Sequence, residues 1–137
     1  MLEIQTPVSE SGYILVIDDD PAVSGLYLKY LAPLGLIIES SIGAKEAWTL
    51  LRERIPLLVL LDVLMPDTDG WDILQQLRSD QATRDVPVIV CSVLADPNMA
   101  IAMGATAVLS KPIDPMDMFA QVSQILRLEG SAGAPSS

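Results

Sequence analysis

The chain has 137 residues, of which 50% are hydrophobic and 19% are charged. This length suits one domain with its own core, and the hydrophobic share excludes a disordered composition. The formal net charge of −10 disfavours binding to phosphate backbones and anionic lipid, so neither nucleic acid nor a membrane is an expected partner. With one cysteine and no apolar run near the roughly 18 residues of a membrane span, the chain is expected in the cytoplasm.

Short apolar runs, rich in β-branched residues, recur along the chain between more polar segments. Runs of this kind are typical of strands that are buried on both faces, as in a parallel sheet. The predicted strands cover residues 13–17, 36–38, 57–61, 86–91 and 106–109.

The segments between these strands have the apolar spacing of amphipathic helices. Two of them open with an Asp-Pro pair, Asp20-Pro21 and Asp114-Pro115, which predicts an N-cap followed by proline at the first helical position. The predicted helices cover residues 21–34, 43–53, 71–78, a short 97–103, and 115–126.

Alternating strands and helices predict an α/β fold: a doubly wound, five-stranded parallel sheet with helices on both faces. In such sheets the ligand site lies beyond the carboxyl ends of the strands. The folded domain is expected over residues 12–129. Residues 1–11 are predicted to be a flexible N-terminus, and the Gly/Pro/Ser-rich residues 130–137 a disordered tail or linker.

Polar side chains follow four of the predicted strands. Asp18 and Asp19 follow the first, Asp62 the third, Ser92 the fourth and Lys111 the fifth. Carboxylates brought close together repel one another, and a hard divalent cation with oxygen ligands relieves that repulsion. The placement therefore predicts a Mg²⁺ and phosphate site, in which Lys111 supplies a cation and Ser92 a hydroxyl donor.

Other acidic residues nearby have simpler interpretations. Asp20 is predicted to be only a helix cap, and Asp67, Asp69 and Gly70 are predicted to be turn residues in the loop after Asp62.

Four segments, ILVIDDDPAV, LLDVLMPDTDGWDIL, VPVIVCS and MGATAVLSKPID, together resemble the receiver domain of two-component response regulators over residues 12–129. The resemblance implies a flavodoxin-like receiver fold that works in a phosphorelay. It also implies that Asp62 is the phosphoacceptor. Asp19 would bind Mg²⁺ directly, Asp18 largely through water, and the Leu64 backbone carbonyl would be a further ligand.

The resemblance also assigns the residues that contact the phosphoryl group. Ser92 would occupy the position of the switch hydroxyl and move toward the added group. Lys111 would contact the group directly, with a cis peptide bond to Pro112.

The implied partners are a sensor histidine kinase or phosphotransfer protein, which supplies the phosphoryl group, and an unknown downstream protein; a homodimer stays open. The chain would not be an enzyme, beyond catalysing its own phosphorylation and dephosphorylation.

Two alternatives remain: a non-phosphorylated docking module, and a receiver cut from a larger hybrid kinase or regulator. A haloacid-dehalogenase phosphatase would need D-x-D-x-T or D-x-D-x-V, and the chain has Ala22 at the last position. A flavodoxin would need an uncharged phosphate loop after the first strand.

Two departures from the family pattern concern the output. Val108 stands where many receivers carry an aromatic switch residue, and the stretch from Ser92 to Gly104 is short. A signal is therefore expected to leave through that stretch.

The residues two beyond Asp62 and Ser92 are Leu64 and Leu94. Their side chains cannot hydrogen-bond a water, which predicts a long-lived phosphoryl group.

Overall fold

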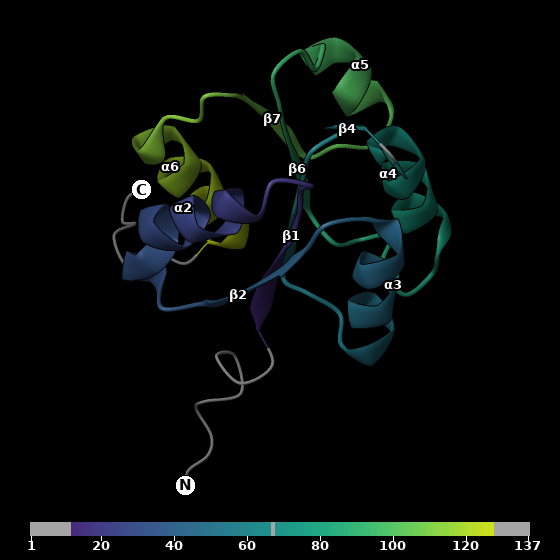
Figure 1. Cartoon of the computed structure of the whole chain (residues 1–137), viewed down its shortest axis with the longest axis horizontal. Helices are drawn as coiled ribbons and strands as arrows, with labels where there is room; N and C mark the ends of the chain where they lie inside the picture. Colours follow the sequence, from purple (N-terminus) through teal and green to yellow (C-terminus); the bar gives the residue numbers. More distant parts are fainter. Residues whose placement is uncertain (1–11, 67, 128–137) are drawn as a thin grey trace, which may run out of the picture.

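A computed structural model describes residues 12–66 and 68–127. Its main feature is a five-stranded parallel sheet in the order β2-β1-β3-β6-β7, which confirms the predicted doubly wound fold (Figure 1). The order reverses direction at β1, as the two halves of a doubly wound sheet require. The strands are β1 (Tyr13–Ile17), β2 (Ile37–Ser41), β3 (Leu58–Leu61), β6 (Val88–Ser92) and β7 (Ala107–Ser110).

Helices cover both faces of this sheet (Figure 1). On one face, α2 and α6 pack on a cluster that includes Ile14, Leu60 and Ile89. On the other face, α3, α4 and α5 pack on a cluster that includes Leu15 and Val90. The helices are α2 (Pro21–Leu31), α3 (Ala44–Glu53), α4 (Gly70–Ser79), α5 (Pro97–Ala102) and α6 (Pro115–Leu126), with a 3-10 turn, η2 (Ala32–Leu34), after α2.

All five predicted strands are present as the strands of the main sheet, and their bounds shift by one or two residues at most places. The first strand matches its prediction of residues 13–17. The largest miss is β2, which was predicted over residues 36–38 and continues to Ser41. Its second half, Glu39 to Ser41, is polar because β2 is an edge strand with partly exposed side chains. Strand β2 therefore lacks the continuous apolar run by which the other predicted strands were found.

The capping predictions are confirmed. The Asp20 side chain accepts a hydrogen bond from the Ala22 backbone N–H at 3.0 Å, so Asp20 is the N-cap of α2. The Asp114 side chain accepts one from the Asp117 N–H at 3.0 Å and begins α6. The first helix is shorter than predicted, because the chain tightens into η2 and then turns at Gly35, where φ is 70°.

The loop after Asp62 contains a feature that was not predicted. Strands β4 (Leu64–Met65) and β5 (Thr68–Asp69) form a two-stranded antiparallel sheet, and Asp69 then caps α4 by accepting from the Trp71 N–H at 2.9 Å. Of the residues predicted to be turn residues there, Asp67 lies outside the described residues. The segments predicted to be a flexible N-terminus and a tail, residues 1–11 and 130–137, lie outside them as well. No helix formed by the described residues is both long enough and apolar enough to cross a membrane.

Candidate functional site

Residues from four neighbouring strands meet at the carboxyl edge of the sheet. Asp18 and Asp19 follow β1, Asp62 follows β3, Ser92 ends β6 and Lys111 follows β7. Strands β1, β3, β6 and β7 are consecutive in the sheet, so their ends place these side chains side by side. The sequence-based prediction that these residues gather at one edge is confirmed.

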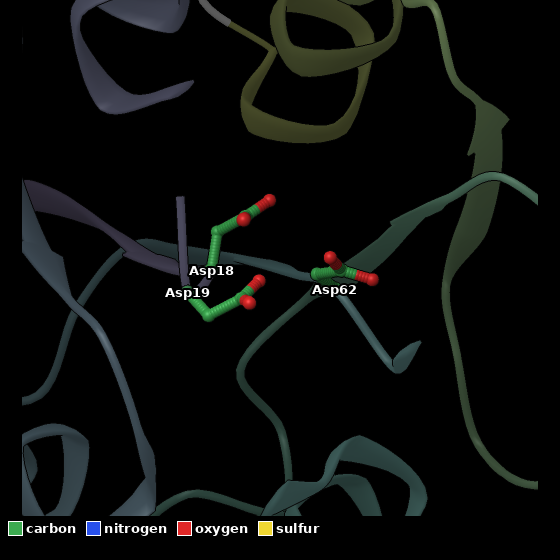
Figure 2. A group of neighbouring side chains, drawn as sticks. All are labelled: Asp18, Asp19 and Asp62. Carbon is green, nitrogen blue, oxygen red and sulfur yellow. The ribbon is translucent and has the colours of Figure 1, made fainter. Parts of the chain in front are cut away.

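Three carboxylates form the centre of the site. One carboxylate oxygen from each of Asp18, Asp19 and Asp62 lies within 4.8 Å of the others. Figure 2 shows these groups converging on one region, two from the end of β1 and one from the end of β3. Asp18 and Asp62 are buried, at 4% and 6% exposure, whereas Asp19 faces solvent. The site is therefore a small acidic cluster that opens to solvent beside Asp19.

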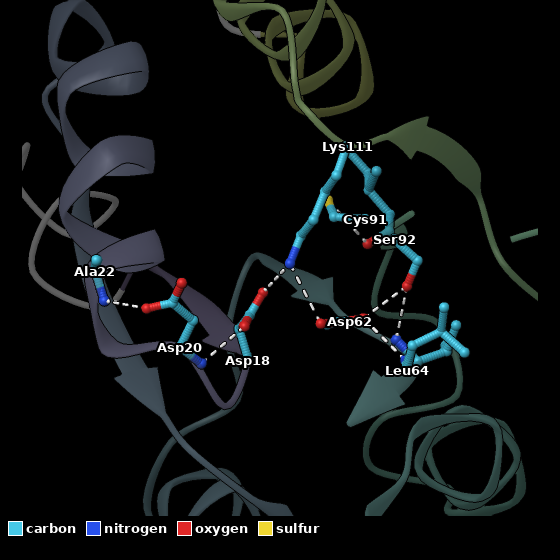
Figure 3. A network of polar contacts seen from close by, with 10 residues as sticks. Asp18, Asp20, Ala22, Asp62, Leu64, Cys91, Ser92 and Lys111 are labelled. Atoms are coloured by element: carbon cyan, nitrogen blue, oxygen red, sulfur yellow. Dashed lines mark hydrogen bonds and ion pairs between the residues drawn. The ribbon is translucent and has the colours of Figure 1, made fainter. Parts of the chain in front are cut away.

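One cation faces this cluster. The Lys111 Nζ lies 2.7 Å from Oδ2 of Asp18 and 3.2 Å from Oδ2 of Asp62, between the two buried carboxylates (Figure 3). The Lys111 backbone N–H donates to the Ser92 carbonyl at 3.0 Å, which ties the lysine to the neighbouring strand end. The peptide bond from Lys111 to Pro112 is cis, as the family resemblance implied.

Burial and charge act on these groups in opposite directions. Burial raises the pKa of Asp18 above its usual value, although Lys111 opposes the shift and the nearby Asp62 adds to it. Burial alone would lower the pKa of Lys111, but its hydrogen bond to Asp18 and the charges of both carboxylates outweigh burial and raise it. Three carboxylates thus share one ammonium group, and the remaining negative charge favours a further cation.

Besides the ammonium group of Lys111, two neutral donors orient the Asp62 carboxylate. Its Oδ1 accepts hydrogen bonds from the Leu64 backbone N–H at 2.9 Å and from the Ser92 hydroxyl at 2.7 Å. The Ser92 Oγ in turn accepts from the Val63 backbone N–H at 3.0 Å, so this fully buried hydroxyl is bonded on both sides (Figure 3). Ser92 was predicted to donate to an added phosphoryl group. In this structure its hydroxyl donates a hydrogen bond to the Asp62 carboxylate.

Gly70 has a closer relation to the site than a turn residue. A Cβ atom built on Gly70 would collide with the Cα of Val63 and lie 2.7 Å from the carbonyl oxygen of Asp62. Only glycine lets the first turn of α4 approach the Asp62 loop this closely. The segment LLDVLMPDTDGWDIL, on which part of the family resemblance rests, contains this glycine, but a local motif does not show which backbone atoms the glycine contacts.

Leu64 and Leu94 lie two residues beyond Asp62 and Ser92, and both have apolar side chains. Leu64 is 49% exposed and Leu94 is 81% exposed, so both contact solvent beside the Asp62 carboxylate loop and the end of β6. The predicted role of the Leu64 carbonyl as a metal ligand stays a prediction.

Comparison with known proteins identifies the family. Residues 14–123 match the model of the response regulator receiver domain. The chain is 35% identical over 117 residues to the DNA-binding dual master transcriptional regulator RpaA of Synechocystis sp., a match that covers 83% of this chain and 48% of that protein. It is 34% identical over 114 residues to a 14.6 kDa protein of Leptolyngbya boryana, covering 81% of this chain and 87% of that protein.

A solved structure agrees with these sequence matches. The signal receiver domain of a DNA-binding response regulator from Colwellia psychrerythraea 34H superposes with a TM-score of 0.76 at 27% identity, over 85% of this chain and 98% of that one. The chain spans about half the length of two curated relatives that it matches, 48% of RpaA and 58% of the response regulator Rre1 of Synechocystis sp..

These relatives bear on the predicted partners. The expectation of no nucleic-acid partner is not supported, because RpaA is a DNA-binding protein, although the match spans only about half of it. The phosphatase and flavodoxin alternatives are excluded by the family match over residues 14–123. The fold, the acidic cluster and the matching family model agree: this chain belongs to the response regulator receiver domains of two-component systems.

Proposed function

We propose that this domain accepts a phosphoryl group on Asp62 in a Mg²⁺-dependent reaction. The observation that carries the proposal is the cluster of Asp18, Asp19 and Asp62 within 4.8 Å, with Lys111 Nζ beside it. The family works as a phosphorylation switch and not as a conventional enzyme. The domain itself would catalyse only its own phosphorylation and dephosphorylation.

The donor set of the cluster fits Mg²⁺. Carboxylate oxygens are the hard ligands that this ion prefers, and it commonly keeps several waters and a phosphate oxygen in its coordination sphere. Asp18, Asp19 and Asp62 would hold the ion together with the Leu64 backbone carbonyl. When bound, Mg²⁺ supplies positive charge that offsets the oxygens of the transferring phosphoryl group.

The protein side chains orient the reacting groups. In the proposed transfer, an Asp62 oxygen forms a bond to phosphorus while the bond between phosphorus and a donor imidazole nitrogen breaks, and the imidazole leaves after taking up a proton. Lys111 would turn from Asp18 toward the phosphoryl oxygens, where its charge stabilises the transition state. The Ser92 hydroxyl now donates a hydrogen bond to Oδ1 of Asp62, and it would donate to a phosphoryl oxygen instead.

The phosphoryl donor would be a sensor histidine kinase or a phosphotransfer protein, in keeping with the family's interaction with histidine kinases. The chain has no histidine, so within it there is no group of this kind to supply the phosphoryl. We propose a cytoplasmic location, a downstream protein partner and, as an option, a homodimer. The match to about half the length of two transcriptional regulators supports the alternative that this receiver is part of a longer regulator.

A mass measurement tests the proposal directly. Incubation with acetyl phosphate and Mg²⁺ should add the mass of one phosphoryl group, and EDTA should abolish the addition. Asp62→Asn should not be labelled, whereas the control Asp72→Asn, which alters an exposed carboxylate in the first turn of α4, should be labelled normally. Undiminished labelling of Asp62→Asn would rule out Asp62 as the phosphoacceptor.

A further inference from the structure

Helix α5 is weakly attached to the core. Among its six residues, all of them described, Ala100 is the one that is fully buried. Met99 and Ile101 on the same helix are 43% and 51% exposed. A helix of this length is not stable by itself in water, so its position depends on what holds its two ends.

The downstream end of α5 is closed by a Schellman motif. Gly104 has φ of 113°, its N–H donates to the Ile101 carbonyl at 3.0 Å, and the Ala105 N–H donates to the Ala100 carbonyl at 2.9 Å. These bonds use two of the carbonyls that the last turn would otherwise leave unpaired. The carbonyl of Gly104 itself points out of the motif and needs a donor from elsewhere.

That donor is Arg78, in the last turn of α4. Its Nε donates to the Gly104 carbonyl at 2.8 Å, and its Nη1 donates to the carbonyls of Val86 at 2.8 Å and Arg84 at 3.1 Å. The arginine stem also lies across the glycine, because a Cβ atom built on Gly104 would be 2.9 Å from the Cγ of Arg78. Hydrogen bonds from a charged, fixed guanidinium are among the strongest in proteins, so this contact is a firm attachment.

Helix α4, which carries Arg78, is itself firmly placed. Its residues Ile73, Leu74 and Leu77 are at most 2% exposed. Its first residue, Gly70, lies against the backbone of the Asp62 loop. Arg78 therefore ties the downstream end of α5 to a helix that the core and the Asp62 loop hold in place.

The upstream end of α5 is attached differently. The chain leaves β6 at Ser92, whose hydroxyl is bonded to Asp62, and reaches the N-cap Asp96 through a short exposed segment. In that segment Val93 and Leu94 are 60% and 81% exposed. The upstream end thus depends on Ser92, a side chain whose hydrogen bond phosphorylation of Asp62 would disturb.

We propose that Arg78 fixes the downstream end of α5, so that a change at Ser92 swings the helix about Gly104 instead of displacing it whole. This inference rests on the proposed phosphorylation of Asp62. It makes Arg78 a positioning residue for the output, with no contact to the reacting atoms. The exposed side chains of Val93 and Leu94 would move more than that of Met99, because they lie farther from the pivot along the chain.

Amide hydrogen exchange with and without beryllofluoride and Mg²⁺ tests the pivot, since beryllofluoride mimics an acyl phosphate. In the unaltered protein, beryllofluoride should change protection across residues 93–100 and leave the amides of Gly104 and Ala105 unchanged. In Arg78→Gln, those two amides should exchange about tenfold faster even without beryllofluoride, because the closing motif loses its support. Beryllofluoride should then alter them too.

Matched variants separate the pivot from a general loss of stability. Arg52→Gln makes the same charge change in the last turn of α3, where the exposed Arg52 side chain has no hydrogen bond or ion pair within residues 12–66 and 68–127, and it should behave as the unaltered protein. Arg78→Lys keeps the charge but loses the fork, and it should show the same effect more weakly. It also provides the test if Arg78→Gln does not fold.

Three results would overturn the inference. One is unchanged exchange at Gly104 and Ala105 in both Arg78 variants, which would show that Arg78 does not anchor the helix. Another is a beryllofluoride effect on these amides in the unaltered protein as large as that across 93–100. The third is no beryllofluoride effect even in the Asp62 loop, which would overturn the proposed function and the swing together. Exchange at Gly104 and Ala105 in the Arg78 variants without beryllofluoride separates that case from a failure of the anchor alone. Faster exchange there would show that Arg78 still anchors the helix.

Discussion

The ammonium group of Lys111 lies closer to Asp18 than to Asp62: Nζ is 2.7 Å from Oδ2 of the first and 3.2 Å from Oδ2 of the second. Both carboxylates are buried, and the exposed Asp19 adds a third negative group. Lys111 therefore neutralises part of the negative charge that a bound divalent cation would otherwise neutralise. Cation binding and the position of Lys111 should be coupled.

Removing this ammonium group should strengthen metal binding and weaken phosphoryl transfer. In Lys111→Met the Mg²⁺ dissociation constant should fall several-fold, because the cluster loses its competing positive charge. Phosphorylation by acetyl phosphate should slow by about 100-fold, because the transferring oxygens lose a donor. Calorimetric titration and intact-mass kinetics measure the two effects. Lys29→Met, an exposed lysine of α2, is the control and should change neither. Weaker Mg²⁺ binding by Lys111→Met would contradict the competition.

Two glycine-to-alanine substitutions should have opposite effects on stability. Gly70→Ala should cost about 2–4 kcal/mol, because its Cβ collides with the Val63 backbone and strains the Asp62 loop. Gly25→Ala should stabilise by about 0.5–1 kcal/mol, because Gly25 is exposed within α2 and a Cβ there meets nothing within 4 Å. Urea unfolding measures both. Equal effects of the two substitutions would show that the close approach at Gly70 carries no strain.

The phosphoryl group on Asp62 should be long-lived, since Leu64 and Leu94 offer no hydrogen bond to an attacking water. The double variant Leu64→Asn with Leu94→Glu should dephosphorylate several-fold faster, because polar side chains there can position that water. The decay of the phosphorylated mass after removal of the donor gives the rate. Leu28→Asn, a comparably exposed leucine on α2, should leave the rate unchanged. An unaltered decay in the double variant would assign the lifetime to other residues.

Cys91 should be unreactive in the folded protein. It is 1% exposed, and burial raises the pKa of its thiol to about 12, so almost no thiolate forms at pH 8. A disulfide reagent should modify one thiol per chain only as the protein unfolds, and the modification should follow the urea unfolding curve. Prompt modification of the native protein would show that the β6 end of the core opens far more readily than the rest.

The amino-acid sequence by itself determined the strands of the main sheet, the helices around it and which strand end carries each reactive residue. Continuous apolar runs and Asp-Pro caps are local signals, so the buried strands and the starts of α2 and α6 could be predicted from neighbouring residues alone. The edge strand β2 was predicted too short, because half-exposed strands need no apolar run. Parallel strands end at one edge, so the gathering of Asp18, Asp62 and Lys111 followed from their positions.

Only the tertiary structure decided how these groups pair. Ser92 bonds to Asp62 across 30 residues and Lys111 to Asp18 across 93, and Arg78 reaches Gly104 across 26. Two further features also depend on the tertiary structure: the close approach of Gly70 to the Asp62 loop, and the small β4–β5 sheet. Which oxygen receives which donor depends on ångström-scale placement of separately packed strands and helices, and no local pattern of residues encodes that placement.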